Sequence, residues 1–413
     1  MQKINTSKTY LPNISFIYYF IFLLIGLFLR IRLGLYAYDI VVFMFIPYFL
    51  MIRRKINRGI VQYLLMLWLL IFVPASISFG YQFFAGEEVS GMSYYIIYNT
   101  FVLTCYIIFI GTTFRYIELN YNIIILLISI PVFLSLYMYF FPDISLLLQS
   151  VYVVPKRLER FGGIFGRDVN QLGYYSTLLI ILSCFLKMRK QIGIAFYLVV
   201  LSSLFAIVIS GMRVGILLVI ILFTFLTLTT KSKMIRIRDL AVLGLTIALC
   251  LVLFANIFQG EIHYFKERFS LELLYDQALG KHGSLHLGNM YKKWFPIMFQ
   301  NENIFSILFS LLPSWKFSDS FIIFILANGG FLGFFGFVMF ALFNVSLIWR
   351  AKVGNKPILF FVLLFNLLIG IKGNFMFNNI GMFLFVFIVM TVLNDSCQHS
   401  ALLIQTESNG LDA

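Results

Sequence analysis

The chain has 413 residues, of which 61% are hydrophobic and 12% charged, and its formal net charge is +14. Because roughly a quarter of the residues in a soluble domain are charged, this composition excludes a chain of ordinary soluble domains. In a soluble protein the basic excess would indicate nucleic acid; here we interpret it as a topology signal plus basic residues at a site, and expect no nucleic-acid partner. Repeated apolar runs of about twenty residues predict an all-α, polytopic integral membrane protein.

The apolar runs predict about twelve transmembrane helices. The first two runs are separated only by Arg30 to Arg32, and the last two only by Gly373-Asn374. Residues 1–394 are predicted to form a single transmembrane domain, and 395–413 a polar cytoplasmic tail. The predicted helices cover residues 14–29, 33–52, 60–79, 94–114, 121–141, 170–187, 192–209, 211–230, 238–258, 319–348, 357–373 and 375–393.

Lysine and arginine residues in the short connections set the expected orientation of the chain. With the N-terminus in the cytoplasm, the short inner connections are basic, as at 53–58 and 231–238, while the short outer connection 80–93 has no basic residue. Both termini are then cytoplasmic. Two outer loops, 142–169 and 259–317, nevertheless contain many basic residues, and these need a reason other than topology.

The longest polar segment, 259–317, contains aromatic and leucine residues that argue against disorder, so we expect a small folded cap on the membrane domain. Its apolar spacing predicts two amphipathic helices, at 262–273 and 287–295, that rest on the bilayer surface or on the helix bundle. His282 and His286 have the spacing of zinc ligands on a helix, but neighbouring glycines disfavour a helix there. No metal and no other cofactor is therefore expected.

A basic, glycine-rich stretch within the first outer loop, 156–168, leads directly into the predicted helix 170–187. Arginine can bind phosphate oxygens bidentately, glycine lets the backbone approach a ligand closely, and a helix N-terminus favours an anion. Binding of an anionic substrate and binding of lipid headgroups at the membrane surface both fit this pattern.

Arg213 lies in the turn Ser210-Gly211-Met212-Arg213-Val214-Gly215, between two apolar runs that are joined by almost no loop. An arginine at the mouth of a helix pair is costly in a membrane and usually faces a wet cavity or a partner, although snorkelling to the interface is an alternative. Asp39 and Asp319 are predicted to lie toward the same outer face. They could act chemically or form a structural ion pair with Arg213.

Glycine spacing also predicts a close helix contact late in the chain. The small residues recur within the predicted helix 319–348, where they would allow a neighbouring helix to approach. They are Gly329, Gly333 and Gly336.

The order of these features resembles the O-antigen polymerase and O-antigen ligase superfamily of bacterial polysaccharide membrane enzymes. The resemblance spans most of the chain, and its motifs are weak individually but specific in order and spacing. They are the outer loop with Arg160-Phe161-Gly162-Gly163-Ile164-Phe165 that leads through Asn170 into a helix, the turn 210–215, the large late outer loop, and Asp319-Ser320-Phe321 followed by Asn328-Gly329-Gly330-Phe331-Leu332-Gly333.

This resemblance implies a GT-C-like, metal-independent glycosyltransferase that acts on glycans carried by undecaprenyl diphosphate, at the outer face of the bacterial inner membrane. Arg160 and Arg213 would neutralise the diphosphate. In the ligases a histidine in the late outer loop is a candidate base, whereas the matching neighbourhood here, Phe317-Ser318-Asp319-Ser320, has none. That difference favours a polymerase and makes Asp319 the first candidate for the base that takes the acceptor proton.

The other predicted site residues would bind the lipid diphosphate or the glycan, and two of them are acids that could replace Asp319 as the base. They are Arg157, Glu159, Arg167, Asp168, Asn170 and Arg268. Membrane lipid and the lipid-linked oligosaccharide are the expected partners, and the resemblance adds a chain-length regulator.

The sequence leaves alternative functions open. A repeat-unit polymerase for O-antigen, capsule or exopolysaccharide is the first, and a ligase that attaches finished glycan to another acceptor is the second. A flippase for lipid-linked oligosaccharide also fits many helices and an outward charged cavity. A transporter is expected to have internal repeats and charges near the bilayer midplane, whereas this sequence has no visible repeat and its conspicuous charges gather at one face.

Overall fold

The computed structural model describes residues 58–84, 97, 100–105, 107–108, 121–141, 163, 169–189, 191–229, 244, 304–309, 321–350, 356, 359–365 and 388–389. All regular structure in these residues is helical, and four of the helices are long and apolar enough to cross a membrane: Gly59–Phe84, Tyr121–Phe140, Gln171–Met188 and Gly329–Leu347. The all-α membrane class is thus supported.

The predicted spans agree closely with the described helices. The predictions 121–141, 170–187, 192–209 and 211–230 correspond to α6 (Tyr121–Phe140), α8 (Val169–Met188), α9 (Ala195–Ser210) and α10 (Arg213–Thr229). The predicted spans 14–29 and 33–52 lie outside the described residues, and only fragments of 94–114, 238–258, 357–373 and 375–393 are described. The total of twelve spans and the GT-C-like arrangement therefore remain predictions.

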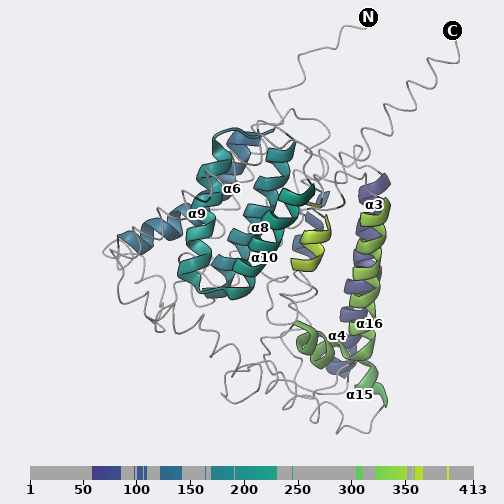
Figure 1. Ribbon diagram of the computed structural model, residues 1–413. Coiled ribbons are helices and arrows are strands. Elements are labelled where there is room, and N and C mark those ends of the chain that lie inside the picture. The colour runs from purple at the N-terminus through teal and green to yellow at the C-terminus, as the bar shows by residue number, and fades with distance from the viewer. Residues whose placement is uncertain are drawn as a thin grey trace, which may run out of the picture.

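Helices α6, α8, α9 and α10 form a bundle with α8 at its centre (Figure 1). The side chains of α8 are buried along nearly its whole length, because α6, α9 and α10 all pack against it. Tyr175 of α8 donates a hydrogen bond of 2.6 Å from its hydroxyl to the carbonyl oxygen of Ile128 in α6. In a helix without a polar face, such buried hydroxyl groups fix how neighbouring helices are rotated.

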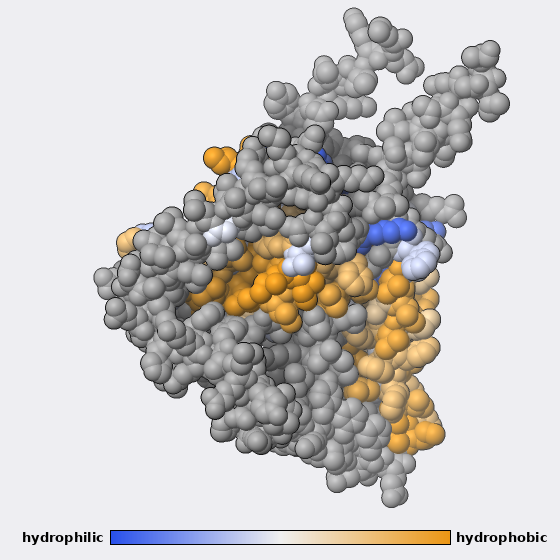
Figure 2. Space-filling view, viewed as in Figure 1, coloured by the Kyte–Doolittle hydropathy of each residue, from blue (hydrophilic) through white to orange (hydrophobic). Residues whose placement is uncertain are grey.

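A second group combines α3 (Arg58–Leu67), the π-helical segment η3 (Trp68–Phe72) and α4 (Val73–Phe84), which form one continuous span, with α15 (Ile304–Phe309) and α16 (Phe321–Arg350). Figure 1 shows α3 and α16 side by side, with α15 at one end of the pair. Figure 2 shows the outer face of this group as an apolar column, as expected for a surface in contact with lipid.

Pro74 accounts for the π-helical segment. Proline has no N–H to donate to the carbonyl four residues earlier, so the oxygen of Leu70 loses its α-helical partner. The N–H of Val73 instead donates to the carbonyl of Trp68, five residues back. The helix widens there without breaking, as in the single-turn π-bulges of other α-helices.

The predicted helix 319–348 is present as α16 but is not straight. Gly330 adopts φ 57° and ψ −160°, which residues with a side chain rarely adopt, so the helix changes direction at this residue. Of the three glycines predicted to pack closely, only Gly336 lies against another helix; Gly329 has open space beside it, and Gly333 touches only Ile325 of its own helix. The second close contact of α16 is made by Gly330, which lies against the backbone of Leu308.

Candidate functional site

The predicted site residues divide into two sets. Arg213 is the first residue of α10, and Asn170 lies in the first turn of α8. The others lie outside the described residues: Arg157, Glu159, Arg160, Arg167, Asp168, Arg268 and Asp319. The described part of the first outer loop is Gly163 alone.

The turn that carries Arg213 is a Schellman motif, which explains why its glycine is needed. Gly211 has φ 63°, and its N–H donates to the carbonyl of Val208, while the N–H of Met212 donates to that of Ile207. These two bonds satisfy the last carbonyls of α9 and reverse the chain within two residues. Arg213 consequently follows at once as the first residue of α10.

Both helices that carry site residues begin at the same end of the bundle. The chain runs along α8, returns along α9 and reverses again at Gly211, so α8 and α10 are parallel and pack against each other. Their N-termini therefore lie side by side. Each helix N-terminus carries a partial positive charge of roughly half a unit, and neither first turn contains an acidic residue.

A contact through Gly173 joins the two sequence motifs. A Cβ atom on Gly173, in the first turns of α8, would lie 2.6 Å from the Cβ of Met212 and 2.6 Å from the Oγ of Ser210. Only glycine lets α8 rest this closely on the α9–α10 turn. The structure thereby brings the beginning of the helix that follows the basic loop onto the turn that precedes Arg213.

Gly215 continues this close approach one turn further along α10. A Cβ atom there would lie 2.7 Å from the Oγ1 of Thr177 in α8, whose hydroxyl donates to the carbonyl of Gly173 over 2.8 Å. Two glycines, one from each helix, thus hold the two N-termini together. The relative position of the two helix beginnings is thus set by the packing of these two glycines against buried side chains of the neighbouring elements.

Gly163 places the first outer loop against α6. It has φ 55°, and a Cβ atom on it would overlap the side chain and the backbone of Ser135. Ser135 lies toward the end of α6 where Phe140 contacts Phe205 of α9, ring centroids 5.6 Å apart. Gly163 of the basic loop therefore lies at the end of the bundle where α8 and α10 begin. Glycine is needed here for its backbone angle as well as for its size.

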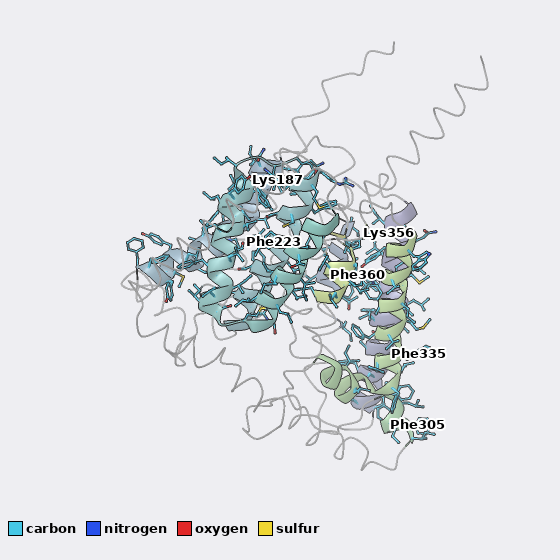
Figure 3. The ribbon with its side chains drawn as sticks, viewed as in Figure 1. Lys187, Phe223, Phe305, Phe335, Lys356 and Phe360 are labelled. Atoms are coloured by element: carbon cyan, nitrogen blue, oxygen red, sulfur yellow. The ribbon has the colours of Figure 1, made fainter. Side chains whose placement is uncertain are left out.

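The opposite end of the bundle carries ordinary interface residues. Lys187 lies 4.9 Å from the ring centroid of Tyr197, and the guanidinium of Arg189 lies 4.6 Å from that of Phe185. Such cation–π contacts on aromatic rings are typical of basic residues at a membrane surface. Figure 3 shows Lys187 at the same end of the molecule as Lys356, and both belong to connections predicted to be cytoplasmic.

One feature of the late polar segment was not predicted from the sequence. α15 is a six-residue helix within the last part of the segment 259–317, and it packs on α4 and α16. The predicted amphipathic helices 262–273 and 287–295 lie outside the described residues. Among the described residues, no three His, Cys, Asp or Glu side chains are grouped as metal ligands would be.

Comparison with protein-family models, with curated proteins and with solved structures found no match to this chain.

Proposed function

We propose that this chain is a membrane glycosyltransferase that polymerises lipid-linked polysaccharide repeat units. The observation that carries the proposal is the position of Arg213, at a glycine-formed turn packed against the beginning of α8. The family resemblance depends on the order and spacing of its motifs, which include 160–170 and 210–215. Gly163 and Asn170 of the first motif lie at the same end of the bundle as the turn 210–215, as a shared substrate site requires.

The depth of the turn supports a functional role for Arg213. α9 has 16 residues, which gives it a length of about 24 Å. The hydrocarbon core of a bilayer is about 30 Å thick. If Lys187 and Arg189 lie at one interface, a helix of this length would end several ångströms short of the other interface, inside the apolar layer. A charged guanidinium at that depth needs water or an anionic partner, and a diphosphate supplies the second.

The reaction fits the charges at this end of the bundle. A hydroxyl oxygen of the acceptor repeat unit attacks the anomeric carbon of the lipid-linked chain, the bond from that carbon to the diphosphate oxygen breaks, and the hydroxyl proton passes to a carboxylate. Negative charge grows on the departing undecaprenyl diphosphate. Arg213, Arg160 and the N-termini of α8 and α10 would stabilise that charge, and Asp319 would accept the proton.

The experiment is a complementation assay in a strain from which the gene has been deleted. Arg213→Ala and Arg160→Ala should each leave surface glycan as single repeat units, at membrane protein levels equal to wild type. Arg189→Ala is the matched control, because this arginine lies at the other end of α8 against Phe185. Normal polymer length in both site variants would overturn the assignment.

The deletion strain itself separates the alternatives. Surface glycan limited to one repeat unit supports polymerisation. Polymer that accumulates on undecaprenyl diphosphate would instead indicate a ligase, and repeat units trapped inside the cell would indicate a flippase. A reporter fused at Lys281 should read as external; a cytoplasmic reading would contradict the orientation on which the proposal depends.

A further inference from the structure

We propose that α15 is an interfacial helix that lies in the bilayer boundary, with Ile304, Phe305 and Leu308 against lipid acyl chains. The proposal concerns membrane lipid as a partner of this helix and does not depend on the proposed enzymatic function. It rests on the distance of α15 along two candidate spans, on the contacts of its last backbone carbonyls, and on the apolar side chains that it leaves exposed.

The depth follows from two helices that reach α15 independently. α3 begins at Arg58, and Ser78, about twenty residues later, donates a hydrogen bond to the carbonyl of Phe309 at the end of α15. In α16, Trp349 is 80% exposed with Lys356 above its ring, and Gly330, about twenty residues away, contacts the backbone of Leu308. Twenty residues of helix span about 30 Å, the thickness of the hydrocarbon core.

Both anchors therefore place α15 at the boundary opposite the basic residues. Lysine is enriched at the cytoplasmic interface and tryptophan at either interface, so Lys356 and Trp349, which contact each other, mark one interface. Figure 3 shows Lys356 and Phe305 at opposite ends of this helix group, with Phe335 between them. α15 is thus held where the acyl chains meet the headgroups.

The last carbonyls of α15 are turned toward the protein, as a lipid environment demands. Phe309 accepts the hydroxyl hydrogen of Ser78. The peptide group that joins Leu308 to Phe309 lies against Gly330, where a side chain would leave no room. A helix end in contact with acyl chains cannot leave carbonyls without partners, because no water is present to bind them. A helix on a hydrated cap would need neither contact.

Whereas the last carbonyls of α15 contact the protein, several of its side chains are exposed. Its sequence, IFSILF, contains no charged residue, and Ile304, Phe305 and Leu308 are 64%, 56% and 41% exposed. The first and the last are four residues apart and so share one helix face. The helix on which α15 packs, α16, also exposes apolar residues, among them Phe331 and Phe335. Because α16 is a candidate membrane span, lipid is the occupant that covers both surfaces.

Site-directed spin labelling tests the proposal on the full chain in nanodiscs of phosphatidylethanolamine and phosphatidylglycerol. In a background with the four native cysteines replaced, Phe305→Cys and Ile304→Cys are labelled separately, and collision with oxygen and with a water-soluble nickel chelate is measured. Met339→Cys is the control for a lipid-exposed position within α16. We expect both α15 labels to collide more often with oxygen than with nickel, by several-fold, as the control does.

Two results would overturn the proposal. Collision mainly with nickel would mean that α15 lies in water as part of an external cap, and weak collision with both reagents would mean that protein covers it. A second measurement tests the anchor: Gly330→Ala should raise nickel collision at a label on position 305, whereas Gly329→Ala, which has open space beside it, should not. Equal behaviour of the two variants would show that the contact with Gly330 does not set the depth.

Discussion

Gly336 of α16 lies directly against the carbonyl oxygen of Leu70 in the π-helical segment, so closely that a Cβ atom on the glycine would overlap that oxygen. Leu70 is the residue whose carbonyl lost its α-helical donor to Pro74. A glycine Cα–H can approach such an oxygen and form a weak hydrogen bond. One helix thus has a carbonyl that lost its α-helical donor, and the facing helix supplies the residue small enough to lie against it.

Substitution of this glycine should separate the two helices. We predict that Gly336→Ala lowers the free energy of unfolding by about 1–3 kcal/mol, the usual cost of forcing extra atoms into a packed contact. Gly329→Ala is the matched control within the same helix and should cost little, because nothing lies within 4 Å of the position that its Cβ would take. The measurement is unfolding in mixed detergent micelles. Equal stability of the two variants would contradict the packing described for Gly336.

The second prediction concerns the effect of Gly173 on the length of the surface glycan. Gly173→Ala would push Met212 away from α8 and displace the beginning of α10, so we expect shorter surface glycan at equal protein level. Gly80→Ala, in α4 with open space around it, should leave chain length unchanged. Adding Met212→Gly to Gly173→Ala removes both Met212 atoms that the new Cβ would meet and should restore part of the chain length. A failure of Gly173→Ala to alter the glycan would mean that this contact does not position the site.

The prediction of α8, α9 and α10 from sequence succeeded because apolar length and glycine are local signals. Each helix is a run long enough to be recognised, and the turn at Gly211 is marked by the residue that a left-handed helix end favours. Arg213 could accordingly be placed at a helix mouth from the sequence alone. Its neighbours could not, because the approach of Gly173 to Met212 depends on how α8 is rotated in the bundle.

Other features lacked a sufficient local signal. α15 has six residues, too few to show helical periodicity, and it lies within a long amphipathic segment. Its conformation is set by contacts with Ser78 and Gly330, which are far away in the chain. Pro74 was visible in the sequence, but a proline can kink a helix or widen it into a π-bulge. Packing of α16 at Gly336 accompanies the widened form here.

The third prediction concerns Tyr175 and the stability of the helix bundle around the site. Its buried hydroxyl donates to the carbonyl of Ile128, so Tyr175→Phe should lower the free energy of unfolding by about 0.5–1.5 kcal/mol without creating a cavity. Tyr137→Phe is the matched control, since that side chain of α6 is 46% exposed and should contribute much less. Thermal unfolding followed by size-exclusion chromatography would compare the two. A larger loss for Tyr137→Phe would contradict the described burial.

Tyr63 and Asn344 allow the contribution of one interhelical hydrogen bond to be isolated. The hydroxyl of Tyr63 in α3 donates to the Oδ1 of Asn344 in α16 over 3.1 Å, and the Nδ2 of Asn344 donates to the carbonyl of Phe340 over 2.8 Å. Tyr63 also packs edge-on against the ring of Phe340, 5.8 Å between centroids. Tyr63→Phe keeps the ring contact and removes only the hydrogen bond.

A double-mutant cycle with Tyr63→Phe and Asn344→Leu should therefore give a coupling energy of about 0.6 kcal/mol, the average for side-chain hydrogen bonds between membrane helices. The value is small because each partner finds other hydrogen-bonding groups when the helices separate in the membrane. Unfolding of the four proteins in the same lipid–detergent mixture supplies the cycle. A coupling energy of zero would mean that this hydrogen bond does not contribute to the packing of α3 against α16.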